Sequence, residues 1–203
     1  AVLHQQDDYG NGLAEAFTAA AKANGATVTS DQAYQLGTKD FQTQLDKLSK
    51  ESPDAIFIAG FYPEAVKIAQ QASSAGIELP LYGSDGLLSP DLIKLGGDAV
   101  EGITLQGAFT PTLQTPEVQD FVKRFKAKFS EEPSSWAALA YDAVHAVKAA
   151  TDKGTTREQI KDGLAALQGL KGITGDITFD DKGDRIASPV FLTVKGGQFT
   201  PVS

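Results

Sequence analysis

The 203 residues are 41% hydrophobic and 22% charged, which is enough apolar material for one globular domain or two small lobes. A net charge of −8 and a pI of about 4.7 would repel nucleic acid and anionic membranes, so both are excluded as partners. The absence of cysteine excludes disulfides, thiolate nucleophiles and cysteine metal sites. No apolar run approaches the roughly 20 residues of a membrane helix, so we expect no direct membrane insertion. Residues 1–4 predict a strand, and any export signal is expected upstream.

Residues 1–108 alternate short β-rich runs with helical periods, which is typical of a parallel sheet with helices on its faces. We therefore predict a doubly wound α/β unit. Its strands are expected at residues 1–4, 27–34, 55–59, 81–83 and 102–108. Helices are expected between them, with one-sided apolar stripes at Leu13, Ala16, Phe17 and Ala20, at Phe41, Leu45 and Leu48, and at Ala65, Ile68, Ala69 and Ala72.

After Pro111 three helical patterns follow without an intervening strand, so a domain boundary is expected there. They cover residues 116–129, 134–153 and 156–167. The first of these helices is expected to bury Val118, Phe121, Val122, Phe125 and Phe129. The closing stretch predicts extended segments at residues 173–179 and 190–194, with a polar turn between them at 180–184.

Candidate binding residues follow the ends of three predicted strands, because ligands of open α/β sheets bind beyond the carboxyl ends of the strands. Tyr9 stands in a glycine-containing loop after the first strand. Phe61 and Tyr62 follow the third strand, just before a proline that is typical of a helix start. Ser84 and Asp85 follow the fourth strand, where a buried carboxylate would need a cationic partner such as a ligand ammonium group.

Each of these loops also has a purely structural interpretation, and the residues alone leave both open. Tyr9 could be an exposed loop tyrosine, and Asp85 could cap the following short helix or turn. The aromatic pair Phe61 and Tyr62 could form a hydrophobic staple onto the next helix. Asp40 is interpreted as a helix N-cap and is assigned no ligand.

Signals for catalysis or for a bound metal are weak. The two histidines, His4 and His145, do not form a helical pair, and a metal site of His4 with Asp7 and Asp8 is the less favoured interpretation of a strand-end histidine. The acidic run at 180–184 lacks the glycine and the glutamate that a calcium loop requires. Nucleophile elbows, Walker A loops and dinucleotide fingerprints are absent from the sequence. We therefore expect no metal, no cofactor and no enzymatic activity.

Several short motifs resemble the type I periplasmic binding proteins of the leucine/isoleucine/valine class, which serve ABC importers. They occur in the family's order over nearly all of the chain: Asp8-Tyr9-Gly10-Asn11-Gly12-Leu13-Ala14, Gly37-Thr38-Lys39-Asp40-Phe41, Pro53-Asp54-Ala55-Ile56-Phe57, Gly60-Phe61-Tyr62-Pro63-Glu64, Gly83-Ser84-Asp85-Gly86 and Asp181-Lys182-Gly183-Asp184. In that family two α/β lobes close on an amino acid, and the complex then docks on a membrane permease.

The resemblance implies a ligand-binding role for Tyr9, Phe61 and Asp85, with Tyr62 and Ser84 as secondary candidates. Tyr9 would be an aromatic wall and Asp85 the acidic partner of the ligand's ammonium group. Phe61 stands where relatives often carry tyrosine, which keeps the wall and removes a hydroxyl. Asp85 stands where relatives carry glutamate, and its shorter side chain would alter the geometry around the ammonium group.

The resemblance also implies how the chain is divided. Residues 1–108 with 190–203 would form the second lobe, and residues 109–189 the later half of the first lobe. The chain is expected to be a fragment that lacks the earlier part of the first lobe. Hinge closure would occur at the crossovers near residues 108–111 and 188–190.

The function expected from the resemblance is capture of a branched-chain or other apolar amino acid for an ABC importer. The location would be periplasmic, or extracellular with a membrane anchor in a Gram-positive organism. An alternative on the same fold is a ligand-sensing regulator or receptor ectodomain. An enzyme that uses Asp85 with His4 or Tyr9 is disfavoured because no nucleophile is paired with a base.

Overall fold

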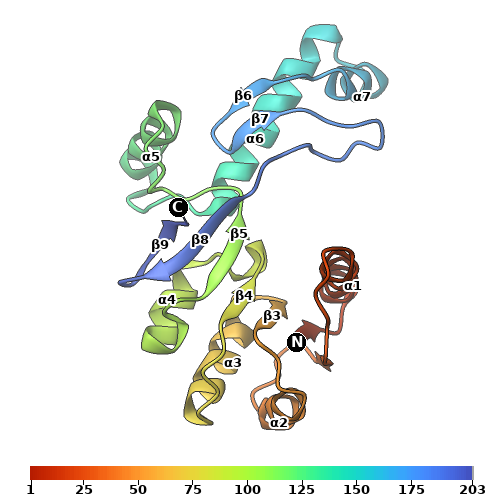
Figure 1. The fold of residues 1–203 in the computed structure, drawn as a ribbon. Helices are drawn as coiled ribbons and strands as arrows, with labels where there is room; N and C mark the ends of the chain where they lie inside the picture. The colour runs from red at the N-terminus through yellow and green to blue at the C-terminus, as the bar shows by residue number, and fades with distance from the viewer. Residues whose placement is uncertain (203) are drawn as a thin grey trace. The chain divides into compact units, whose positions relative to one another are not determined.

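The computed structural model describes residues 1–202 and divides them into two compact units (Figure 1). Unit 1 comprises Ala1–Gln106 and the C-terminal segment from Phe191, and unit 2 comprises Gly107–Val190. The chain therefore passes twice between the units. The boundaries expected from the sequence lie close to both crossing points.

Unit 1 is built on one mixed sheet, whose parallel strands β1 to β5 form the predicted doubly wound unit and whose β8 and β9 pair antiparallel. Its strand order is β2-β1-β3-β4-β5-β8-β9, and β1 to β5 pair in parallel. The chain moves from β1 outward to β2 and then returns to the other side of β1 as β3. This reversal creates a topological switch point, where the loops after β1 and β3 separate and leave room for a ligand. The elements are β1 (Val2–Gln5), α1 (Asp8–Ala23), β2 (Asp31–Tyr34), α2 (Gln42–Lys50), β3 (Ile56–Ala59), α3 (Tyr62–Ser74), β4 (Leu81–Gly83), α4 (Pro90–Gly96), β5 (Thr104–Gly107), β8 (Val190–Lys195) and β9 (Gln198–Pro201).

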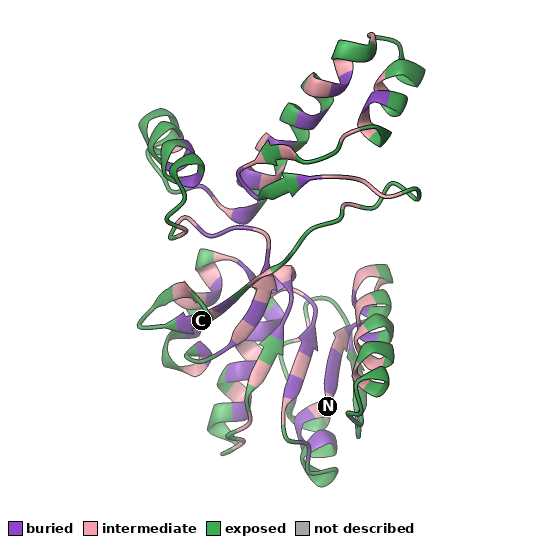
Figure 2. Ribbon diagram, turned by 45° about the horizontal axis from the view of Figure 1, so that its top comes forward, coloured by how far each residue is buried: buried purple, intermediate pink, exposed green. Residues whose placement is uncertain are grey.

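The apolar stripes predicted for α2 and α3 are confirmed, because every one of their residues is buried. Both faces of β3 are also covered: Ile56 and Ile58 are fully buried on one side, while Phe57 on the other side stacks against Phe17 of α1. Figure 2 shows this burial along the central strands. The face predicted for α1 is partly wrong, since Ala16 and Ala20 are exposed and Ala14 is buried.

Several other features of unit 1 differ from the sequence-based expectation. Helix α1 begins at Asp8, so Tyr9 lies in its first turn rather than in a loop. Residues 27–30 are not part of β2. Helix α4 was not predicted; it begins with Pro90 after Ser89, whose hydroxyl accepts the backbone N–H of Asp91. The final segment is a hairpin of β8 and β9, because Gly196 and Gly197 both have positive φ and so reverse the chain.

Unit 2 contains three α-helices, a short 3-10 helix at Thr151–Lys153 and a two-stranded antiparallel sheet. Helix α5 has the predicted bounds, and hydroxyl groups cap all three helices: Thr115 on α5, Ser134 on α6 and Thr156 on α7. The elements are α5 (Pro116–Phe129), α6 (Ser135–Ala150), α7 (Arg157–Ala165), β6 (Leu170–Gly172) and β7 (Gly175–Ile177). Within residues 1–202 there is no helix of the length and apolarity needed to cross a bilayer.

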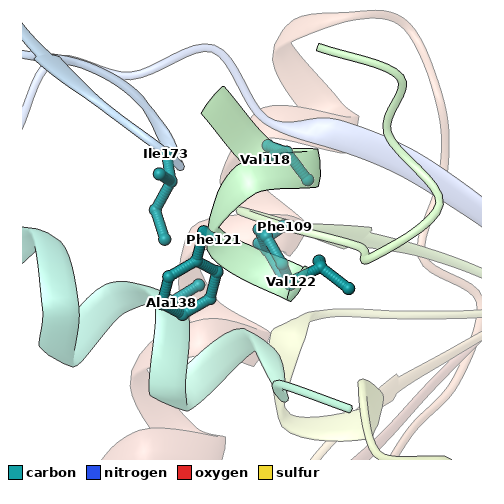
Figure 3. Packing of buried hydrophobic residues seen from close by; sticks show 6 residues of the cluster. All are labelled: Phe109, Val118, Phe121, Val122, Ala138 and Ile173. Atoms are coloured by element: carbon teal, nitrogen blue, oxygen red, sulfur yellow. The ribbon is translucent and has the colours of Figure 1, made fainter. Parts of the chain in front are cut away.

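The core of unit 2 forms where α5 meets α6 and the β6–β7 hairpin (Figure 3). It contains Phe109, Val118, Phe121, Val122, Ala138 and Ile173. Phe125 is partly buried against this cluster, but the predicted burial of Phe129 is wrong, since its side chain is 52% exposed. The last turn of α5 therefore extends beyond the core.

The predicted extended segment at 173–179 is instead a hairpin, and a buried carboxylate holds its turn. Asp142 of α6 accepts the backbone N–H groups of Ile173 and Thr174 at 3.0 and 2.9 Å and the Thr174 hydroxyl at 2.5 Å. Arg185 donates to the same hydroxyl at 2.7 Å. This buried polar cluster fixes the turn of the hairpin on α6, beside the contacts that Ile173 makes in the core.

The acidic run at 180–184 forms a tight turn. Asp180 Oδ1 accepts the backbone N–H groups of Lys182 and Asp184 at 2.9 and 2.8 Å, and Gly183 has a φ of 88°. The side chain of Asp180 is therefore engaged by its own backbone, as in other Asx turns.

Candidate ligand-binding site

The first turn of α1 holds Tyr9 directly beyond β1. Asp7 is the N-cap of the helix, and its carboxylate accepts the Gly10 N–H at 2.7 Å and the side-chain amide of Gln5. A Cβ atom at Gly10 would overlap the carbonyl oxygen of Gln5, so glycine lets the helix begin close to the strand end. Tyr9 is half-buried there.

Tyr9 contacts residues from the loops after β3 and β4, although they are more than fifty positions away in the sequence. Its ring stacks on Phe61, with 5.0 Å between centroids and 28° between planes. Its hydroxyl lies 2.7 Å from Ser84 Oγ and donates to Asp85 Oδ1 at 3.0 Å. Parallel strands end at a common edge, and this brings the loops after β1, β3 and β4 together.

The hydrogen-bond directions follow from the single proton of the phenol. A carboxylate only accepts, so the Tyr9 hydroxyl donates its hydrogen bond to Asp85, and Ser84 then donates to the Tyr9 oxygen. Burial raises the pKa of the Tyr9 hydroxyl, and the negative charge of Asp85 raises it further. Tyr9 is therefore a neutral donor at physiological pH, and it orients one oxygen of Asp85.

The alternative roles considered for these residues can now be compared with their contacts. The Asp85 side chain accepts the Tyr9 hydroxyl and caps neither of the helices that follow: Asp85 is the first residue of the short 3-10 helix Asp85–Leu87, whose N-cap is Ser84, and Ser89 caps α4. Phe61 directly precedes α3, and its ring contacts Tyr9. Tyr62 is the first residue of α3, and it is not one of the residues that join Tyr9, Phe61, Ser84 and Asp85 through hydrogen bonds or ring stacking.

Two glycines allow the loops to approach one another. A Cβ atom at Gly86 would overlap the carbonyl oxygen of Gly60 and lie 3.1 Å from the Tyr9 hydroxyl and 3.3 Å from Phe61 Cδ1. Neither glycine has a positive φ, so it is lack of space, not backbone conformation, that disfavours a larger residue. Sequence reasoning did not identify this contact, because a loop glycine carries no signal of the backbone it will touch.

His4 does not approach the acidic residues with which a metal site was considered. Its Nδ1 lies 2.8 Å from Asp31 Oδ1 on the neighbouring strand β2. Among residues 1–202, histidines and carboxylates nowhere gather in a group of three that could hold a metal ion. The prediction of Asp40 as a helix N-cap is wrong, because the N-cap of α2 is Phe41; Asp40 lies one residue earlier, and its Oδ1 accepts the backbone N–H of Gln42 at 3.0 Å.

Ser84 also borders a mostly apolar hollow of about 400 Å³ beside α1. Its walls come from α1, β3, β4, β5 and Phe191, and Tyr9, Phe61 and Asp85 are not among the lining residues. The aromatic and acidic cluster is therefore a separate feature at the carboxyl ends of the strands.

Buried Tyr34 leads to a prediction at alkaline pH. Burial, with the nearby negative charge of Glu64, raises its pKa above the ordinary value of 10. The folded protein thus keeps a proton that the unfolded chain releases, so stability falls as the pH rises above about 10. Urea unfolding at several pH values between 8 and 11 should show wild type losing up to about 1.4 kcal/mol per pH unit more than Tyr34→Phe. Parallel curves for the two proteins would contradict this.

The fold is an α/β unit that places two aromatic rings and a carboxylate at the carboxyl ends of parallel strands, where open α/β sheets bind their ligands. A family model described as periplasmic binding protein matches residues 1–197, and the chain belongs to this family.

Individual relatives agree with this assignment. The chain is 28% identical to the Leu/Ile/Val-binding protein of Escherichia coli over 91% of its own length and 50% of the relative's. It is 30% identical to Leu/Ile/Val-binding protein homolog 2 of Brucella abortus over 95% and 52% of the two chains. The chain thus spans about half the length of the curated relatives it matches.

Solved structures give the same result. A leucine-binding protein of Thermotoga maritima superposes with a TM-score of 0.91 at 32% identity, over 100% of this chain and 59% of that one. A branched-chain amino acid transporter substrate-binding protein of Streptococcus pneumoniae, solved with isoleucine, gives 0.85 at 31% identity, over 98% and 57%.

Proposed function

We propose that the protein to which this chain belongs captures an amino acid with an apolar side chain and delivers it to the permease of an ABC importer. The observation that carries the proposal is the cluster of Tyr9, Phe61 and Asp85. Asp85 forms no ion pair with a lysine or arginine among residues 1–202, so an ammonium group would supply the missing positive charge.

The aromatic pair supplies the other half of the recognition. Tyr9 and Phe61 stack beside the carboxylate and form one apolar surface next to one negative charge. An amino acid such as leucine combines an ammonium group with an apolar side chain, and it matches both features. The names of the relatives support this choice, since they bind leucine, isoleucine or valine.

The division of labour between the two units is also part of the proposal. Unit 1 would be the second lobe of the complete protein, and unit 2 the later half of its first lobe. The ligand would be held by closure of the two complete lobes, since a ligand that contacts both favours the closed state. The two chain crossings near residues 106 and 190 would be part of the hinge.

Membership of this family implies a periplasmic or extracellular location. The named relatives are solute-binding proteins, so binding rather than catalysis is the proposed output. They do not favour the alternative of a regulator or receptor ectodomain.

Isothermal titration of the complete protein tests the proposal. Leucine, isoleucine and valine should each bind and release or absorb heat. 4-Methylpentanoate, which is leucine without its amino group, is the matched control and should bind at least about 30-fold more weakly, because it cannot pair with Asp85. Absence of binding by every apolar amino acid, or equal affinity for leucine and the control, would contradict the proposal.

A further inference from the structure

Tyr34 is the last residue of β2 and is not one of the proposed ligand contacts, but its side chain extends toward the loop after β3 that carries Phe61. Its side chain is 2% exposed, and its ring packs edge-on against fully buried Phe41 at 5.2 Å and 79°. Its hydroxyl has no hydrogen-bond partner among the described residues. This hydroxyl instead lies against Gly60, where an added Cβ would overlap it and stand 3.2 Å from Tyr34 Cζ.

The contact with Gly60 crosses the sheet. Strand β1 lies between β2 and β3, and Tyr34 pairs in register with Gln5 of β1. The same hypothetical Cβ at Gly60 would be 3.6 Å from Gln5 Cβ. The tyrosine ring therefore passes the end of β1 to reach the loop after β3, and its burial against Phe41 prevents it from swinging away.

From Gly60 the contacts continue into the site. The Gly60 carbonyl packs on the Cα of Gly86, and Gly86 adjoins Asp85 and faces Tyr9 and Phe61. Tyr34, Gly60 and Gly86 thus form a continuous column, defined by these three residues, that ends on the proposed ligand contacts.

We propose that Tyr34 is a positioning residue of the ligand site. It does not touch the ligand; the length of its side chain fixes the position of Gly60 and, through Gly86, the positions of Phe61 and Asp85. The affinity measurements that test this proposal rest on the proposed function. The crystal structures that test it need no ligand and depend on geometry alone.

A double-mutant cycle in the complete protein tests the column. Gly60→Ala places a methyl group on the Tyr34 oxygen, so the loop must move, and leucine affinity should fall about tenfold. Tyr34→Phe removes that oxygen. The methyl group that Gly60→Ala adds would then lie nearest to Cζ of the ring, at a distance that small shifts of the loop can increase. The double variant Gly60→Ala/Tyr34→Phe should therefore bind leucine within about threefold of Tyr34→Phe alone.

Tyr82→Phe is the matched control, because Tyr82 of β4 is 43% exposed and does not contact Gly60. It should not rescue Gly60→Ala. Urea unfolding of each variant separates a positioning role from a general loss of stability: Gly60→Ala should bind leucine more weakly even under conditions where its urea curve shows that it is fully folded.

Crystal structures of Gly60→Ala and of the double variant provide a readout that needs no ligand. The stacking of Tyr9 on Phe61 and the bond from Tyr9 to Asp85 should be displaced in the single variant and restored in the double one. Additive affinity losses with undisplaced rings would overturn the proposal. If the wild-type protein binds no amino acid, the proposed function is wrong. The crystal structures still show whether Tyr34 positions Phe61 and Asp85 through Gly60 and Gly86.

Discussion

Replacing Asp85 with asparagine should weaken leucine binding by about 2 to 5 kcal/mol, which is a loss of roughly 30-fold or more in affinity. Asparagine has nearly the same shape and can still accept the Tyr9 hydroxyl, so the aromatic wall stays in place. What disappears is the negative charge that would face the ligand's ammonium group. Isothermal titration of the complete protein measures the effect directly.

Asp8→Asn is the matched control, because Asp8 is exposed and lies one residue before Tyr9. It removes the same charge from the same region and should change affinity by less than about 1 kcal/mol. If Asp85→Asn and Asp8→Asn bind leucine equally well, the affinity depends only on the overall negative charge of the protein. The proposed pairing of Asp85 with the ammonium group is then wrong.

A second large effect is expected at Asp142, in stability rather than in binding. Its two oxygens accept three hydrogen bonds from the β6–β7 turn. Asparagine has one oxygen, and its NH₂ group would face a backbone N–H, so at least one buried donor loses its partner. Asp142→Asn should therefore destabilise unit 2 by about 2 to 4 kcal/mol. Hydrogen exchange of the Ile173 and Thr174 amides reports this locally.

Asp176→Asn serves as its control on the same hairpin. Asp176 pairs with Lys171 at 2.8 Å, but both side chains are largely exposed, so its loss should cost less than about 1 kcal/mol. Equal protection of the Ile173 and Thr174 amides in the two variants would show that Asp142 does not anchor the hairpin.

The alternation of strands and helices in unit 1 could be predicted because each buried strand is a short apolar run and each helix carries a one-sided stripe. The stripe of α3 at Ala65, Ile68, Ala69 and Ala72 is one example, and all four residues are buried. The face of α1 was less predictable, because alanine is compatible with either side of a helix. Ala14 and Ala16 differ only in which of them meets the sheet.

Reversals made by backbone conformation were harder to predict. The turn between β8 and β9 depends on positive φ at Gly196 and Gly197, and the β6–β7 turn depends on Asp142, which lies 31 positions from Ile173. A hydrogen bond of that range leaves no local pattern. The expected single strand at each place was therefore replaced by a hairpin.

The candidate site was predictable to the extent that strand ends indicate it. Tyr9, Phe61 and Asp85 were identified by position and by resemblance, and the parallel pairing of β1, β3 and β4 brings their loops together. The supporting contacts of Tyr34, Gly60 and Gly86 were not identified, because they depend on close backbone packing between strands that only the folded sheet creates.

The most direct test of the central claim is a crystal structure of the complete protein with bound leucine. The ammonium nitrogen should lie within about 3.2 Å of an Asp85 oxygen, with the leucine side chain against the rings of Tyr9 and Phe61. Leucine bound elsewhere, with Asp85 facing solvent or another part of the protein, would contradict the account.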